Sequence, residues 1–141
     1  MNLSEAIELA NEVHLDQVDK GGAPYILHLV RVAAKMETDE EHIVAYLHDA
    51  LEDGHVSIAD LPPESLAALD ALTRRPSESY MEYIRRLAEN ALARKVKMAD
   101  LEDNMDLSRI THLRPEDYRR HEKYTKARAY LGAIIDRNRA G

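Results

Sequence analysis

Cysteine is absent from this 141-residue sequence, so disulfide bonds and thiolate metal sites are excluded. No run of apolar residues approaches the roughly 20 that a membrane span needs, and we expect no membrane association. Positive charge is also scarce: the formal net charge is −7, and no cluster of Lys and Arg dominates. This argues against wide binding to a nucleic-acid backbone. A small phosphorylated ligand stays compatible, because it needs only a few local cations or a metal ion.

The composition is that of a folded protein. Hydrophobic residues make up 45% and charged residues 32% of the chain, which is typical of a globular protein and not of a disordered one. The length is enough for one domain with a substantial core, so we expect residues 1–141 to form a single domain. The N-terminus lacks the basic start and apolar block of a signal peptide, and we expect a cytoplasmic protein.

Apolar residues recur at a spacing of three to four along nearly the whole chain, which predicts helices. A capping box from Thr38 to Glu41 opens one of them, and Gly54 is the expected stop for the same helix. Sustained alternation with period two is absent, so the predicted fold class is an all-α bundle. The expected helices cover residues 4–17, 26–36, 38–53, a short helix ending at 72, 79–89, 91–107 and 115–138.

The stretch LHDALED concentrates titratable groups in one short helical segment. On a continuous helix, His48 and Glu52 share one face, and Asp49 and Asp53 share the next. A solvated polar face is the ordinary explanation for such carboxylates. Here, however, few cations lie among them, and negative charge at the C-terminus of a helix is unfavourable. A divalent cation near His48 and Asp49 would offset this repulsion.

Two more residues, on other predicted helices, could complete such a site. His28 lies on a mostly apolar helix, where a hydrogen-bonded core histidine is the ordinary alternative. Asp100 lies within a predicted helix beside apolar residues and would be costly to bury unpaired. Together with His48 and Asp49 they form a nitrogen–oxygen ligand set suited to Mn²⁺, Fe²⁺ or Zn²⁺, with positions left for water.

Three stretches resemble a known family in the same order. HLDQVDKGGAPYILHLVRVA is similar to the opening of the hydrolase domain of RelA/SpoT-type alarmone enzymes and their small stand-alone relatives. LHDALED resembles the His-Asp-x-x-Glu-Asp element of that family, and KVKMADLEDNMDL resembles its late Lys-x-Ala-Asp segment. The chain is thereby similar to the HD-domain phosphohydrolases, whose fold is a bundle of about six to eight helices. The family hydrolyses (p)ppGpp, releasing pyrophosphate from the 3′ side.

The resemblance implies a role for each matching position. One Mn²⁺-like ion would be bound, and an acidic pair would orient or deprotonate the attacking water. Other positions would contact a small nucleotide substrate. The metal ligands would be His28, His48, Asp49 and Asp100, the acidic pair Glu52 and Asp53, and the substrate-binding residues Lys20 and Asn104. Lys97 is three positions before Asp100, so it could share the face towards the site and neutralise substrate phosphates.

The sequence departs from the family at the rim of the expected pocket. Asp19, Glu102 and Asp106 stand where the family commonly has other, often basic, residues. Two alternatives therefore stay open beside (p)ppGpp hydrolysis: a phosphohydrolase for a nucleoside monophosphate or cyclic nucleotide, and a non-catalytic module that binds metal or nucleotide. Tyrosines on the last predicted helix are explained by packing or by a subunit interface, which leaves a homodimer open.

Overall fold

The structure is a computed structural model that describes residues 1–53 and 60–140. Most of these residues lie in helices. They are α1 Leu3–Val13, α2 Ile26–Ala33, α3 Asp39–Leu47, α4 Ala50–Asp53, α5 Pro63–Leu72, α6 Tyr80–Leu87, α7 Ala91–Asn104, the 3₁₀ turn η1 Leu107–Arg109 and α8 Pro115–Ala140. These residues contain no strand, only an isolated bridge between Val18 and Pro24. The predicted all-α bundle is confirmed.

Side-chain caps determine where several helices begin. Asn2, Thr38 and Ser79 each accept a hydrogen bond from the backbone N–H three residues later, and the glutamate there bonds back to the N–H of the cap. This reciprocal pair satisfies donors that the first helical turn leaves without intrahelical partners. The capping box predicted at Thr38 is confirmed. Pro115 occupies the first position of α8, also as predicted.

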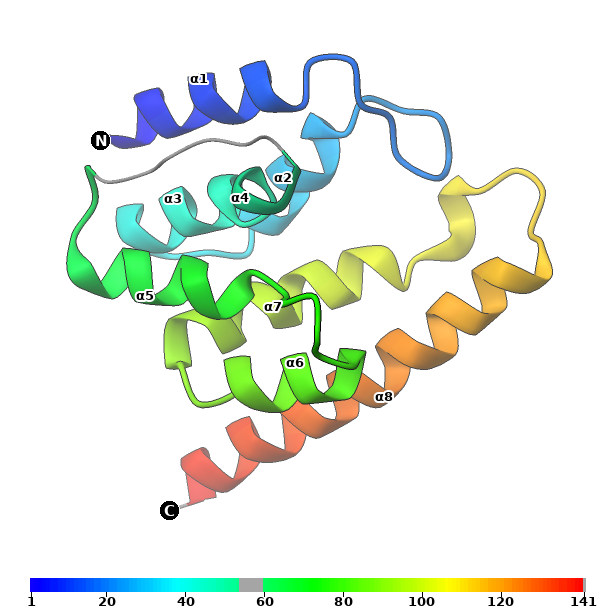
Figure 1. Cartoon of the computed structure of the whole chain (residues 1–141). Helices are drawn as coiled ribbons and strands as arrows, with labels where there is room; N and C mark the ends of the chain where they lie inside the picture. The colour runs from blue at the N-terminus through cyan, green and yellow to red at the C-terminus, as the bar shows by residue number, and fades with distance from the viewer. Residues whose placement is uncertain (54–59, 141) are drawn as a thin grey trace.

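Helix α7 passes through the middle of the bundle and packs against α2, α3, α5 and α8 (Figure 1). Val96 and Leu101 on this helix are completely buried. Burying such a side chain typically contributes about 1.5–3 kcal/mol relative to leaving it exposed. Because neighbouring helices surround α7, a polar residue on it can be carried into the interior, which is where Asp100 lies.

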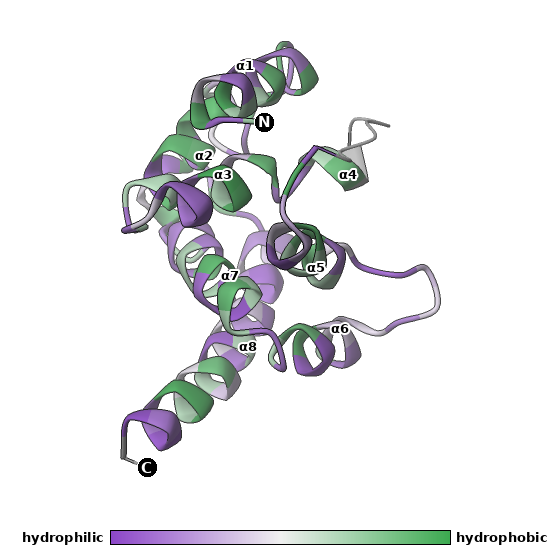
Figure 2. Ribbon diagram, turned by 90° about the vertical axis from the view of Figure 1, so that its left-hand side faces the viewer, coloured by the Kyte–Doolittle hydropathy of each residue, from purple (hydrophilic) through white to green (hydrophobic). Residues whose placement is uncertain are grey.

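Helix α8 crosses one side of the bundle, and its C-terminal end extends beyond the other helices (Figure 2). Ala127 and Leu131 are fully buried, whereas Asp136 and Arg137 further along are exposed. The apolar side of α8 near the middle of the helix therefore packs against the bundle. Across residues 1–53 and 60–140, no helix combines the length and apolar character needed to cross a membrane.

The predicted continuous helix over 38–53 is wrong, because the chain turns at His48 and Asp49. Helix α3 ends at Leu47, and α4 begins at Ala50. In an unbroken helix, the carbonyl of Ala45 would accept the N–H of Asp49. Instead, the carbonyl oxygen of Ala45 lies 2.6 Å from Nδ1 of the His48 ring, which donates a hydrogen bond to it. The expected stop at Gly54 lies outside the described residues.

Other helices end earlier than predicted. Helix α1 stops at Val13, because the chain turns at once, with Gln17 N–H donating to the carbonyl of His14 over 3.1 Å. Helix α7 ends at Asn104 and gives way to η1, where the Asp106 side chain accepts the Ser108 N–H. The end of α7 is set by a side chain that bonds to nearby backbone, which competes with helix continuation.

The connection from α1 to α2 folds into a tight turn. Asp19 Oδ1 accepts the backbone N–H of Gly21 at 2.9 Å and that of Ala23 at 3.0 Å. Gly22 has a φ of +87°, a region that glycine adopts without steric cost. Asp19, the acidic departure noted in the sequence, therefore stabilises the loop backbone as in other Asx turns.

Candidate metal centre

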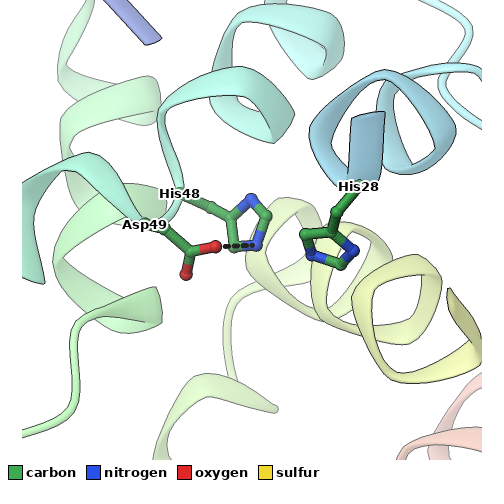
Figure 3. A group of neighbouring side chains, drawn as sticks. All are labelled: His28, His48 and Asp49. Carbon is green, nitrogen blue, oxygen red and sulfur yellow. Dashed lines mark ion pairs between the residues drawn. The ribbon is translucent and has the colours of Figure 1, made fainter. Parts of the chain in front are cut away.

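Three segments that are distant in the sequence bring two histidines and two aspartates together. His28 lies in the first turn of α2, His48 and Asp49 form the turn between α3 and α4, and Asp100 lies on α7. His28, His48 and Asp100 are buried, and the side chain of Asp49 is 20% exposed. Figure 3 shows His48 and Asp49 on the turn between α3 and α4, with the imidazole of His28 facing them from α2.

The donor atoms have separations suited to a shared ion. Single atoms of His28, His48 and Asp49 all lie within 4.8 Å of one another. Asp100 Oδ1 is 2.9 Å from His28 Nε2 and 3.3 Å from His48 Nε2, and Asp49 Oδ2 is 3.2 Å from His48 Nε2. Two donors bonded at right angles to one ion at about 2.1 Å are about 3.0 Å apart, so the contacts fit a common metal.

Both histidines use their other ring nitrogen to bond elsewhere. His28 Nδ1 lies 2.6 Å from Asp103 Oδ2, and His48 Nδ1 lies 2.6 Å from the carbonyl oxygen of Ala45. Carboxylate and carbonyl oxygens only accept hydrogen bonds, so each Nδ1 carries a hydrogen. Nε2 of each ring is then the atom directed towards the centre, as in metal-binding histidines generally.

The centre favours positive charge. Burial lowers the pKa of His28, but hydrogen bonds with Asp100 and Asp103 outweigh burial and raise it to about 9. Burial likewise opposes a charged His48, and the charges of Asp49 and Asp100 raise its pKa overall. Surroundings that favour a proton on these rings also favour a divalent cation between them. A metal ion with nitrogen and oxygen ligands therefore fits the residues present.

Asp100 has two further contacts, both with residues predicted to bind substrate. Lys97 Nζ lies 2.8 Å from Asp100 Oδ2, and Asn104 Nδ2 donates to Oδ1 over 3.2 Å. Burial would raise the pKa of Asp100, but the Lys97 charge and the histidine hydrogen bonds hold it well below its usual range. Asp100 is thus ionised at neutral pH, with Oδ2 paired with Lys97 and Oδ1 directed towards the imidazoles.

A cavity of about 250 Å³ opens beside His28 and Asn104. Among the described residues, its walls carry balanced charge. The cations are Lys20, Arg31, Arg109 and Arg120, and the carboxylates are Asp19, Asp103, Asp106 and Asp117. Three of these cations pair with these carboxylates: Arg31 with Asp103, Arg109 with Asp106 and Arg120 with Asp117. Lys20 forms no ion pair within the described part of the chain. Lys97 is not among the described residues that line the cavity.

The predicted acidic pair follows the centre directly in the chain. The backbone of Glu52 and Asp53 belongs to α4, immediately after Asp49. Their side chains lie outside the part of the molecule that the structure describes. Their water-handling role therefore remains a prediction from the resemblance.

Several residues that contact the centre were not predicted from the sequence. Tyr25 donates a hydrogen bond from its hydroxyl to Asp49 Oδ2. Asp103 contacts His28, and Arg31 and Arg109 both contact Asp103. Spacing was the available signal, because Arg31 follows His28 by three residues and Asp103 follows Asp100 by three. That signal is weak alone, since many charged pairs at this spacing are only surface contacts.

Comparison with known proteins reveals relatives of one kind, although no family model matches the chain. The chain is 30% identical over 142 residues to the bifunctional (p)ppGpp synthase/hydrolase SpoT of Escherichia coli, an alignment covering 87% of this chain and 20% of that protein. It is 31% identical over 143 residues to a probable guanosine-3′,5′-bis(diphosphate) 3′-pyrophosphohydrolase of Synechocystis, covering 88% and 19% respectively. The chain resembles the hydrolase domain of RelA/SpoT-type enzymes.

The RelA/SpoT-type resemblance inferred from the sequence motifs is therefore confirmed. A further relative, the guanosine-3′,5′-bis(diphosphate) 3′-pyrophosphohydrolase of Aquifex aeolicus, is 32% identical over 119 residues, which cover 73% of this chain and 17% of that protein. The chain spans about a fifth of the length of the curated RelA/SpoT-type relatives that it matches.

Proposed function

We propose that the chain is a metal-dependent phosphohydrolase that releases pyrophosphate from the 3′ side of guanosine tetra- or pentaphosphate. The observation that carries the proposal is the convergence of His28, His48, Asp49 and Asp100 beside a cavity. The names of the RelA/SpoT-type relatives supply the substrate class. Residues 1–141 would act as one hydrolase domain on a small nucleotide.

The reaction is attack of water on the phosphorus bonded to the ribose 3′ oxygen. The bond between that phosphorus and the 3′ oxygen breaks, the 3′ oxygen takes a proton, and pyrophosphate leaves. An ion such as Mn²⁺, Fe²⁺ or Zn²⁺, held by the two histidines and two aspartates, would polarise a phosphate oxygen and acidify a water. The chain itself holds His28, His48 and Asp100 at buried positions and Asp49 at a partly exposed one.

Glu52 and Asp53 would hold the attacking water and accept its proton. Their position after Asp49 in the chain and the matching acidic pair in the RelA/SpoT-type motif support this role. General-base assistance of this kind is typically worth ~10²–10⁴-fold in rate. Loss of the base should therefore reduce turnover without removing the metal.

Lys20, Asn104 and Lys97 would act on the substrate in different ways. Lys20 and Asn104 line the cavity, so they would contact the nucleotide directly. Lys97 is paired with Asp100 and would contribute positive charge from behind that ligand. The substrate phosphates would thus meet Lys20 at the rim and the charge of the metal centre.

A second candidate is hydrolysis of a nucleotide with fewer phosphates, such as a nucleoside monophosphate or a cyclic nucleotide. The balanced charge of the cavity walls favours it, since a guanosine polyphosphate carries many negative charges. Product analysis separates the candidates. Purified protein with Mn²⁺ is incubated with ppGpp, pppGpp, GMP and cyclic nucleotides, and products are separated by ion-exchange chromatography.

The expected result is pyrophosphate together with GDP or GTP. Orthophosphate from GMP, or a linear product from a cyclic nucleotide, would favour the second candidate, and no turnover of any nucleotide would favour a non-catalytic binding module. Glu52→Gln should retain the metal content of the parent protein and lose about 10²–10⁴-fold in rate, whereas Asp49→Ala should lose the metal itself. Full activity of Glu52→Gln would refute the assigned role of Glu52.

A further inference from the structure

The imidazole of His28 is held between two carboxylates of the same helix. Asp100 Oδ1 lies 2.9 Å from Nε2 and Asp103 Oδ2 lies 2.6 Å from Nδ1. Both aspartates are on α7, three residues apart, so they project from one face of that helix towards α2. His28 therefore has a carboxylate at each ring nitrogen, one on the side of the metal centre and one on the opposite side.

Two arginines hold Asp103 in place. Arg31 Nε and Nη2 donate to its two oxygens at 2.6 Å and 3.1 Å. Arg109 Nη2 lies 3.3 Å from Oδ2 and donates to the backbone carbonyl of Asp103 over 2.8 Å. The Asp103 side chain is only 8% exposed. A carboxylate this buried is costly without such partners, and these contacts leave it little freedom to move.

This arrangement determines which nitrogen of His28 carries hydrogen. An ionised carboxylate can only accept, so Asp103 requires a hydrogen on Nδ1. When a metal displaces the second hydrogen of the ring, the lone pair is therefore on Nε2, the atom that lies 2.9 Å from Asp100 Oδ1. Rotation of the ring away from the centre would break the 2.6 Å contact with Asp103.

We propose that Asp103 is a positioning residue that holds His28 in the Nδ1–H form and directs Nε2 at the metal. This inference rests on the proposed metal site. The competing explanation is that Asp103 only joins α2, α7 and η1 through its arginine contacts. In that case its loss would lower stability and leave metal affinity unchanged, so the two roles have different consequences.

The test is the metal affinity of Asp103→Asn, a variant of nearly unchanged shape. An amide can turn its NH₂ group towards Nδ1, so it no longer imposes one tautomer. Affinity for Zn²⁺ and for Mn²⁺, measured by competition with a chelator, should fall about 10–100-fold. Glu102→Gln is the matched control, because this neighbouring acidic residue lies at the surface and its partners are Lys35 and Arg128, not His28. Its affinity should equal that of the parent protein.

A second readout follows the tautomer directly. In the Zn²⁺-loaded protein, ¹H–¹⁵N correlation spectra of histidine rings should show hydrogen on Nδ1 of His28, and the Asp103→Asn spectrum should show loss of that single state. Thermal unfolding of both variants measures separately how much Asp103 stabilises the fold by joining α2, α7 and η1. Lower stability with parental Zn²⁺ affinity in Asp103→Asn would overturn the inference.

Asp100→Asn distinguishes failure of this inference from failure of the proposed function. If Asp100→Asn loses metal but Asp103→Asn does not, only the positioning role is refuted. If neither variant loses metal, the metal site is refuted as well, and the positioning role with it.

Discussion

Asp100 combines burial, charge and ligand geometry in one side chain. Its Oδ1 faces both imidazoles, and its Oδ2 contacts Lys97, which lies 5.3 Å from the ring centre of Tyr83. A buried carboxylate requires compensation, and Lys97 supplies it when no metal is bound. The pair therefore allows the carboxylate that we propose as a metal ligand to lie inside a core that is mostly apolar.

Lys97→Met should strongly destabilise the metal-free protein. The change removes one partner of a buried ion pair and leaves Asp100 with less compensation, a loss typically worth about 3–5 kcal/mol. Saturating Mn²⁺ should recover part of this stability, because the ion supplies positive charge to the same carboxylate. Urea unfolding with and without Mn²⁺ measures both effects.

Lys123→Met is the control for this experiment. Lys123 lies 4.5 Å from the centre of the Tyr80 ring and forms no ion pair with a carboxylate in the described segments. Its replacement should change stability by less than about 1 kcal/mol, with no dependence on Mn²⁺. Equal losses in both variants would contradict the assigned pairing of Lys97 with Asp100.

At the scale of elements, the turn between α1 and α2 meets η1 at the edge of the cavity (Figure 1). Gly21 lies so close to η1 that a Cβ atom there would be 2.3 Å from the carbonyl oxygen of Arg109. Backbone atoms face each other at this point, so no flexible side chain can move aside. Glycine is therefore required at position 21, because the loop and η1 approach each other so closely.

Gly21→Ala should cost about 1–3 kcal/mol, the usual range for overpacking, and should displace the loop that carries Lys20. Thermal denaturation checks the stability. Gly132→Ala is the control: it lies inside α8, and its Cβ would meet only the flexible Met98 Cε at 3.4 Å. That variant should be neutral or gain about 0.5–1 kcal/mol from helix propensity. A Gly21→Ala protein as stable as the parent would show that the loop and η1 can separate freely.

The connection between α5 and α6 is joined to α6 by an ion pair between Glu78 and Arg86. Arg86 Nε donates to Glu78 Oε2 over 2.6 Å, and its Nη2 donates to the carbonyl of Thr73 over 2.9 Å. The Arg86 hydrogen bond, only partly opposed by desolvation, lowers the pKa of Glu78 from 4.5 to about 2. A carboxyl with a lowered folded-state pKa stabilises the fold above its unfolded pKa and loses that contribution as pH falls.

Glu78→Gln should therefore be less stable than the parent at pH 7, and the difference should shrink as pH falls from about 4.5 towards 2. Thermal unfolding of both proteins across pH 3–7 measures the difference. Asp70→Asn serves as the control, because its pair with Arg75 is longer, 3.6 Å, and exposed. A difference for Glu78→Gln that stays constant with pH would refute the ion-pair contribution.

At the scale of the whole molecule, α7 joins the core to the proposed metal centre. It packs against four other helices, and Leu101, next to Asp100, is completely buried. Packing around Leu101 and the position of Asp100 therefore depend on the same helix. Loss of core packing here should affect the centre as well as stability.

Leu101→Ala should lower the free energy of unfolding by about 2–5 kcal/mol, through lost apolar burial and the cavity left behind. Urea denaturation measures the loss. Leu15→Ala is the control, since Leu15 is 77% exposed and should change stability by about 0.5 kcal/mol or less. Similar losses for the two variants would show that Leu101 is not part of a well-packed core.

Helical periodicity and local motifs carried much information about this chain. The all-α class, the cap at Thr38 and the start of α8 at Pro115 were predicted correctly, because each depends on residues close in sequence. The break at His48 was not predicted, because it arises from a ring nitrogen bonding to the carbonyl of Ala45. Helix propensity does not predict such a bond, because the bond replaces a helical hydrogen bond only in the folded chain.

The sequence by itself named His28, His48, Asp49 and Asp100 as candidate ligands, because metal ligands must be particular residue types. Only the tertiary structure decided that Asp103 bonds to His28 and that Tyr25 donates to Asp49. The physical reason is that hydrogen bonds act over about 3 Å, and residues so far apart in the chain reach that distance only through helix packing.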